Sequence, residues 1–145
     1  MGLHDKLKSH QDDRINTEKK TGADFMATNK SKPGIIEMPN GIQYQVIKEG
    51  SGPKPKPGST IKAHYRGSLI NGKEFDSSYS RNQPFTAPLN ALIQGWQIMI
   101  PMMPLGSTWR LWIPSDLAYG DRGAGGAIPG GATLQFDIEL LEIKD

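Results

Sequence analysis

The chain has 145 residues, enough for one ordinary domain with a short extension. Hydrophobic residues make up 36% of it and there are 17 glycines, a composition typical of globular proteins that excludes a fully disordered chain. No run approaches the ~18 apolar residues that span a bilayer. The lack of cysteine excludes disulfides and thiolate chemistry, and a net charge of +2 indicates no nucleic-acid or membrane partner.

Residues 1–34 form a polar segment that we predict to be a helical N-terminal extension. Residues 1–32 carry seven Lys/Arg and five Asp/Glu, and the Pro-Gly pair at 33–34 ends the segment. Its apolar residues are few, namely Ile15, Ala23, Phe25 and Met26. Two interpretations follow: a solvated or partly frayed helix, because so polar a helix is marginal in water, or a helix that docks on a partner chain through Ile15, Phe25 and Met26.

The first residues of the chain are polar and lack the apolar region of a signal peptide. We therefore expect a cytoplasmic protein, or a periplasmic one if a leader has been removed.

The first predicted strand lies at residues 42–46. Ile42, Tyr44 and Val46 alternate there with two glutamines, Gln43 and Gln45. This is the period of a half-buried strand.

The rest of the chain continues as short elements separated by turns. A proline-rich loop at 50–58 precedes a strand at 61–69, and Asn71-Gly72 predicts a tight hairpin back into 74–76. After a turn-rich stretch, 92–103 has the apolar density of a buried helix that Pro101 bends or ends early.

The C-terminal part predicts two more strands. Residues 109–113 alternate as a strand, 120–131 form a long glycine-rich loop, and 134–140 form the last strand. The phase slips at Leu140-Leu141, which predicts a bulge or a strand end.

These elements predict an α+β fold in which an antiparallel sheet folds one apolar face over a helix. The expected sheet core is Ile61, Ala63, Trp109, Leu111, Ile113, Leu134, Ile138 and Leu140. From the helix we expect Leu92, Ile93 and Met99 or Met103 to complete it.

Several common catalytic devices are absent from the sequence. It has no Gly-x-Ser-x-Gly elbow, no Walker phosphate loop and no dinucleotide-binding glycine pattern. Of the histidines, His4 and His10 lie in the polar extension, and we expect His64 to be a half-exposed strand residue on the face opposite Tyr65. We therefore expect neither a metal site nor a cofactor.

An excess of apolar and aromatic residues lies near turns and loops: Tyr65, Phe75, Phe85, Ile93, Trp96, Tyr119, Ile128 and Phe136. Two interpretations are open. The residues belong to the core, or they line an apolar pocket with the carboxylate of Asp76 and the phenol of Tyr119 at its rim, the general composition of a small-ligand site.

At this point the sequence resembles the FKBP-type peptidyl-prolyl cis–trans isomerases. The segments that carry the resemblance are Ala63-His64-Tyr65-Arg66-Gly67, Asn71 to Ser78, Arg81 to Phe85, Ile93-Gln94-Gly95-Trp96, Leu117-Ala118-Tyr119-Gly120, Ile128-Pro129 and Thr133 to Leu141. They occur in the order and spacing of the family across about residues 40–145. Ala87, Pro101 and Ala124 depart from its usual pattern.

The resemblance implies a bent half-barrel sheet wrapped around one short helix, formed by residues 35–145. It implies catalytic roles for Asp76, Tyr119 and Tyr65 at a proline-binding pocket. The implied substrate-binding residues are Phe75, Phe85, Leu92, Ile93, Trp96, Ile128, Phe136 and Arg81, with Trp96 as the floor and Arg81 as the ion partner of Asp76.

The extension is similar to that of Mip-like bacterial members of the family, in which a helix precedes the catalytic domain and often mediates dimerisation. The segment is much shorter here, so we expect a monomer or a weak homodimer through the extension. The implied partners are proline-containing polypeptides and macrolides such as tacrolimus and rapamycin.

Two alternatives accompany the isomerase hypothesis. The first is a chaperone module that binds proline segments with little turnover. The second is an unrelated β-rich domain whose aromatic residues are fully buried with no cavity between them.

Overall fold

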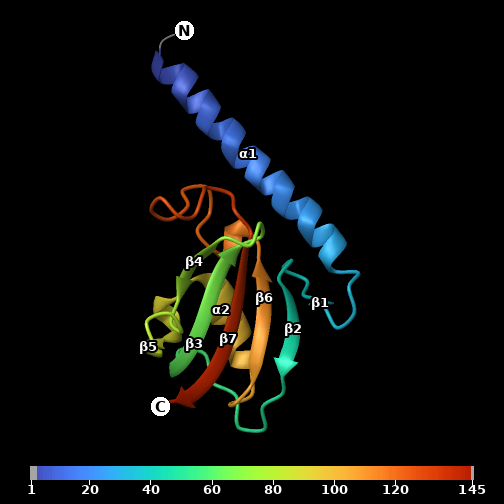
Figure 1. Cartoon of the computed structure of the whole chain (residues 1–145), viewed down its shortest axis with the longest axis vertical. Coiled ribbons are helices and arrows are strands. Elements are labelled where there is room, and N and C mark those ends of the chain that lie inside the picture. Colours follow the sequence, from blue (N-terminus) through green and yellow to red (C-terminus); the bar gives the residue numbers. More distant parts are fainter. Residues whose placement is uncertain (1–2, 145) are drawn as a thin grey trace.

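The computed structural model describes residues 3–144, with side chains from residue 11 onward, so the side chains of His4 and His10 lie outside the described part. One long helix, α1 (Leu3–Asn29), precedes a seven-stranded sheet. Figure 1 shows α1 passing one end of the sheet, with its N-terminal half projecting beyond the domain. No helix in the described residues is long and apolar enough to cross a membrane.

The strands form one antiparallel sheet. They are β1 (Ile36–Glu37), β2 (Gln43–Lys48), β3 (Thr60–Leu69), β4 (Glu74–Ser77), β5 (Phe85–Pro88), β6 (Thr108–Ile113) and β7 (Leu134–Ile143). Their spatial order is β1-β2-β6-β7-β3-β4, and β5 pairs with the opposite end of β3 from β4. The sheet bends around one short helix, α2 (Gln94–Met99), as Figure 1 shows, which confirms the predicted α+β half-barrel.

Helix α2 ends early, as its proline predicted. A 3-10 turn, η2 (Ile100–Met102), follows it directly and contains Pro101, which lacks the N–H needed to continue an α-helix. The helix also packs closely on the sheet, since a Cβ added at Gly95 would lie 2.7 Å from the side chain of Ile113. Two further 3-10 turns, η1 (Leu89–Ala91) and η3 (Ser115–Leu117), lie in the connections.

The predicted core is confirmed. All eight predicted sheet residues are buried, and Met99 and Met103 are buried beside them. Leu92 and Ile93 are only half-buried. The predicted irregularity is also present, because Ala63 pairs with Leu140 and Lys62 with Glu142, which leaves Leu141 without a partner in the register.

Helix α1 docks on the domain of its own chain along one stripe. Ile15, Gly22, Met26 and Asn29 share this stripe at helical spacing. Met26 and Asn29 are buried, and Ile15 is half-buried. The helix also comes close at Gly22, where an added Cβ would lie 2.2 Å from Oγ1 of Thr133.

This docking differs from both interpretations of the extension. Most residues of α1 from Gln11 onward are exposed, as a solvated helix requires, but the helix runs unbroken to Asn29 and one stripe is covered by the same chain. Ala23, predicted on the apolar face, is exposed, and half-buried Phe25 lies under the ammonium of Lys32 at 5.8 Å. The sequence pattern missed Gly22 because a glycine contributes no apolar side chain to a helical stripe.

The alternation in the first strand did not indicate that Gln43 is buried. Gln43 is 0% exposed. Its amide nitrogen donates to the backbone oxygen of Met26 and to a carboxylate oxygen of Glu37, both at 2.9 Å, and its oxygen accepts from Asn29 at 2.8 Å. These bonds form a buried polar latch between the C-terminal end of α1 and β2. A strand period shows which residues share a face, but not that a polar helix covers the second face.

Candidate functional site

A hollow of about 270 Å³ lies between the sheet and α2, near the lower end of the ~300–1,000 Å³ range of small-ligand sites. We call it the ring-lined hollow. Its lining residues are Tyr65, Phe75, Asp76, Phe85, Ala91, Leu92, Ile93, Trp96, Tyr119 and Phe136.

The rings of the hollow come from five different elements. Tyr65 lies on β3, Phe75 on β4, Phe85 on β5, Trp96 on α2 and Phe136 on β7. Because β4 and β5 pair with opposite ends of β3, the edge of β3 is divided near Tyr65. There the backbone oxygen of Tyr65 accepts from the N–H of Ser78 at 2.9 Å, so a loop rather than a strand covers this part of the edge.

The rings meet edge to face and do not collapse onto one another. Trp96 is at the centre, with ring centroids 5.1 Å from Phe136, 5.3 Å from Tyr65 and 5.7 Å from Phe85. Phe75 meets Phe136 at 5.7 Å and an interplanar angle of 89°. Such contacts are favourable for aromatic pairs, and they form a wall that leaves the hollow open.

A glycine on β3 makes room for two of the rings. A Cβ added at Gly67 would lie 2.6 Å from the Phe75 ring and 2.8 Å from the Phe136 ring. A larger residue would therefore push both rings toward the hollow.

The polar rim is built on Asp76. Its carboxylate accepts from the hydroxyl of Tyr65 and pairs with the guanidinium of Arg81. Arg81 also donates to the hydroxyl oxygen of Tyr65 at 3.1 Å, which closes a three-residue network. The network fixes Asp76 at the edge of an otherwise apolar site, where an unpartnered carboxylate would be costly.

The network shifts the pKa of each of its three groups, and the hydrogen bonds to Tyr65 and Asp76 raise the pKa of Arg81. Partial burial raises the pKa of Asp76, but the hydrogen bonds from Tyr65 and Arg81 outweigh it and hold that pKa below its usual value. Burial, followed by the hydrogen bond to Asp76, raises the pKa of Tyr65. At neutral pH the rim therefore carries a carboxylate held by a protonated phenol and a guanidinium.

The structure brings together nearly all of the predicted site residues. Arg81 does not line the hollow and reaches it through Asp76. Ile128 is not among the lining residues; it is buried in the glycine-rich loop and borders a different cleft. Ala91 lines the hollow and was missed, because a small residue in a turn gives no sequence signal.

The fully buried, cavity-free alternative is contradicted. Tyr65, Phe75 and Phe85 are half-buried, Tyr119 is 40% exposed, and a hollow separates them. The expectation for His64 is met: it is half-exposed, with its Nδ1 atom 2.7 Å from Oγ of Ser78 and its ring stacked on Tyr79.

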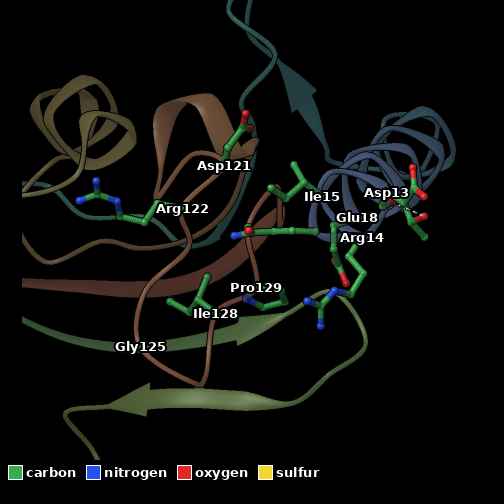
Figure 2. A pocket seen from close by; sticks show the side chains of 12 residues that line it. Asp13, Arg14, Ile15, Glu18, Asp121, Arg122, Gly125, Ile128 and Pro129 are labelled. Carbon is green, nitrogen blue, oxygen red and sulfur yellow. Dashed lines mark hydrogen bonds between the residues drawn. The ribbon is translucent and has the colours of Figure 1, made fainter. Parts of the chain in front are cut away.

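A larger cleft of about 490 Å³ lies between α1 and the loop that follows η3. We call it the α1 cleft; Figure 2 shows it from close by. Its lining residues include Arg14, Glu18, Asp121, Arg122 and Ile128. Charges of both signs line it, and none of its described lining residues is aromatic, so we place the candidate site in the smaller hollow.

Comparison with known proteins identifies the family. A family model described as FKBP-type peptidyl-prolyl cis–trans isomerase matches residues 52–141, more than half of the chain. The chain belongs to the FKBP-type peptidyl-prolyl cis–trans isomerase family. A second model, the domain amino terminal to FKBP-type isomerases, matches residues 1–46 of this FKBP chain.

The similar proteins place the chain in the Mip-like subgroup. It is 46% identical over 132 residues to the isomerase FkpA of Aeromonas hydrophila, covering 91% of this chain and 48% of the relative. It is 44% identical over 126 residues to Outer membrane protein MIP of Legionella longbeachae, covering 87% and 54%. The chain thus spans about half the length of these relatives.

A solved structure agrees with this assignment. The crystal structure of FkpA from Escherichia coli matches with a TM-score of 0.90 at 35% identity, covering 94% of this chain and 64% of that one. Residues 35–145 are only about three quarters of this chain, so the matched region includes most of α1.

Proposed function

We propose that this protein catalyses the cis–trans isomerisation of X-Pro peptide bonds, binding the proline in the ring-lined hollow without a covalent intermediate. The observation that carries the proposal is the hollow itself. Five rings surround about 270 Å³ of space, and the half-exposed side chains of Asp76 and Tyr119 stand at its rim. We also propose that residues 35–145 form the isomerase domain and 1–34 the extension.

The physical basis is the barrier to amide rotation. Resonance imposes a barrier of about 18–20 kcal/mol, and X-Pro isomers interconvert in roughly 10–100 s without help. The planar amide is polar and hydrated, whereas the twisted transition state has lost much of its resonance and dipole. A water-poor, ring-lined site disfavours the planar form more, which is differential binding of the transition state.

Asp76 is proposed to set the electrostatics of the rotating amide. Its lowered pKa keeps it charged at neutral pH, and Tyr65 and Arg81 fix its position. Because both groups already bond to this carboxylate, we propose that Tyr65 acts by holding Asp76 and by contributing a wall.

Tyr119 is proposed to orient the substrate. It lines the hollow, is 40% exposed, and its hydroxyl makes no hydrogen bond to the residues whose side chains are described. It can therefore donate to a substrate carbonyl. Phe75, Phe85, Leu92, Ile93, Trp96 and Phe136 would provide the apolar contacts, with Trp96 as the floor.

The direct test is an isomerisation assay on a short X-Pro peptide, followed by protease coupling or NMR exchange, with and without rapamycin. We expect acceleration that depends on protein concentration and that rapamycin abolishes. A rotation rate equal to that in buffer would overturn the proposal. The chaperone alternative, which expects binding without turnover, is not favoured because the chain belongs to an isomerase family.

Proline-containing polypeptides are the proposed partners, and macrolides such as tacrolimus and rapamycin are proposed to compete with them. A relative from Dictyostelium discoideum, 45% identical over 114 residues, is named FK506-binding protein 4. Titration calorimetry with each macrolide tests this directly.

The assembly state and compartment are proposals of the same kind. We propose a monomer or a weak homodimer through α1, most of whose residues from Gln11 onward are exposed; sedimentation at several concentrations distinguishes them. We propose a cytoplasmic location, with the periplasm as the alternative, and cell fractionation decides between the two.

A further inference from the structure

The loop between η3 and β7, residues 118–133, has a different neighbour at each of its two ends. At its start, Tyr119 lines the ring-lined hollow. At its end, Gly130, Gly131 and Thr133 lie against α1. The same loop therefore contacts both the proposed site and the extension.

The contacts between α1 and this loop are close. A Cβ added at Gly131 would lie 2.7 Å from the backbone oxygen of Ile15 and 3.1 Å from the side chain of Lys19. The ammonium of Lys19 also pairs with the carboxylate of Asp121 at 2.7 Å. Figure 2 shows Ile15 reaching from the helix toward the loop segments that carry Asp121 and Pro129.

Internal bonds connect these contacts to Tyr119. The N–H of Gly131 donates to the oxygen of Gly120 at 2.9 Å, which joins the end of the loop to the residue after Tyr119. The oxygen of Tyr119 accepts from the N–H of Gly123 at 3.2 Å. An added Cβ at Gly130 would lie 1.9 Å from the oxygen of Asp121, so the two limbs of the loop touch.

The helix itself is held in place. The buried latch at Gln43 fixes its C-terminal end to β2, and Gly22 packs on Thr133 one residue before β7. With contacts at Ile15 and Lys19 as well, α1 is attached over about four turns. The match to the structure of FkpA from Escherichia coli covers 94% of this chain with a TM-score of 0.90 and therefore includes most of α1.

We propose that α1 positions Tyr119. In this view Ile15, Lys19 and Gly22 are positioning residues: they hold the loop so that the Tyr119 phenol stays at the rim of the hollow. The extension then helps to hold a residue of the isomerase site in place. This inference rests on the proposed function, since the consequence for turnover follows only if Tyr119 meets the substrate.

The first variant is Gly22→Ala, tested in the full chain. Alanine favours the helix more than glycine does, but its Cβ would lie 2.2 Å from Thr133 Oγ1, so either the Thr133 side chain or the docked helix must shift. We expect kcat/KM to fall about fivefold to tenfold, less than the ~100-fold that a 1 Å misplacement can cost. A loss of helix cannot explain such a result, because the substitution strengthens the helix.

The second variant, Lys19→Glu, has a matched control. It replaces the ammonium of the Lys19–Asp121 ion pair with a carboxylate, so that two negative charges face each other. Lys20→Glu makes the same charge change one residue further on, where Lys20 faces solvent and pairs with Asp24. We expect Lys19→Glu to lower kcat/KM about twofold to threefold because the pair is partly exposed. We expect Lys20→Glu to leave it unchanged and Lys19→Glu with Asp121→Lys to restore it.

A signal from Tyr119 itself reports the positioning without any assay of turnover. The protein has four tyrosines, so fluorine NMR of 3-fluorotyrosine-labelled protein gives a resolvable set, and Tyr119→Phe assigns one signal. We expect Gly22→Ala and Lys19→Glu to shift or broaden that signal, while Lys20→Glu does not.

Unchanged Tyr119 signals and unchanged kcat/KM in both variants would overturn the proposal, as would equal effects of Lys19→Glu and Lys20→Glu. If the wild-type protein shows no isomerase activity, the proposed function fails, and the fluorine signal alone still decides whether α1 positions Tyr119.

Discussion

Two hollows of this molecule meet at the loop after η3, and the smaller one carries the proposed chemistry. The ring-lined hollow is formed mainly by strands and α2, and its one carboxylate is neutralised by Arg81. The α1 cleft is larger, but charges of both signs line it, and Ile15 and Ile128 are its main apolar residues. Size therefore does not mark the site here; a wall of aromatic rings and a carboxylate held by two partners do.

Filling the hollow at its wall should change binding and turnover most. We expect Gly67→Val to abolish macrolide binding and to lower kcat/KM by at least about a hundredfold, because the new side chain drives the Phe75 and Phe136 rings inward. Overpacking of this kind costs about 1–3 kcal/mol of unfolding free energy. Calorimetry and thermal unfolding measure the two effects.

Gly126→Ala is the control for that change. Gly126 belongs to the loop beside the α1 cleft, and an added Cβ there has nothing within 4 Å. We expect binding and stability to stay unchanged. Equal losses of macrolide binding and of stability in Gly67→Val and Gly126→Ala would remove the distinction between the two hollows.

The second effect separates the floor of the hollow from its rim. We expect Trp96→Ala to weaken rapamycin binding more than Asp76→Ala does, because Trp96 contacts three other rings of the site. We expect Asp76→Ala to lower kcat/KM by about tenfold to a hundredfold while proline-peptide binding partly survives. Calorimetry and the isomerase assay check the pair; unchanged rapamycin affinity in Trp96→Ala would rule out the floor assignment.

A third effect concerns the latch that anchors α1. We expect Gln43→Leu to lower the free energy of unfolding by about 1–3 kcal/mol, because Asn29 and the oxygen of Met26 lose their buried partner. Gln45→Leu, on the same strand but half-exposed, is the matched control and should change it little. Urea unfolding measures the free energy of unfolding of both variants. A similar decrease in both would argue against the latch.

The smallest effect is the response to pH. The folded pKa of Asp76 lies below its ordinary value of 3.8, so its contribution to stability is present above that value and is lost as pH falls through the folded pKa. We expect stability and activity to be level between about pH 5 and 8, with this contribution lost below about pH 4. Asp76→Asn should remove this loss of stability at low pH, which thermal unfolding at a series of pH values measures. If the variant loses stability at low pH as the wild type does, Asp76 is not the source of the loss.

The sequence predicted the isomerase domain far better than the extension. Alternation and turn residues identified the sheet, the core and the slip at Leu141, because one buried face imposes a strict period of two. The resemblance supplied eleven site residues, nine of which line the hollow. The docking of α1 was missed because Gly22 and Gln43 act through close approach and buried hydrogen bonds, which leave no hydrophobic pattern.

The divided edge of β3 has a consequence for motion. Strands β4 and β5 are four residues each and pair with the sheet only through β3, whereas β7 is ten residues long and is paired on both sides. Short edge elements open locally at lower free energy than central ones. Amide protons of β4 and β5 should therefore exchange with solvent deuterium before those of β7, so a bulky residue can enter or leave between Phe75 and Phe85 while the centre of the sheet stays closed.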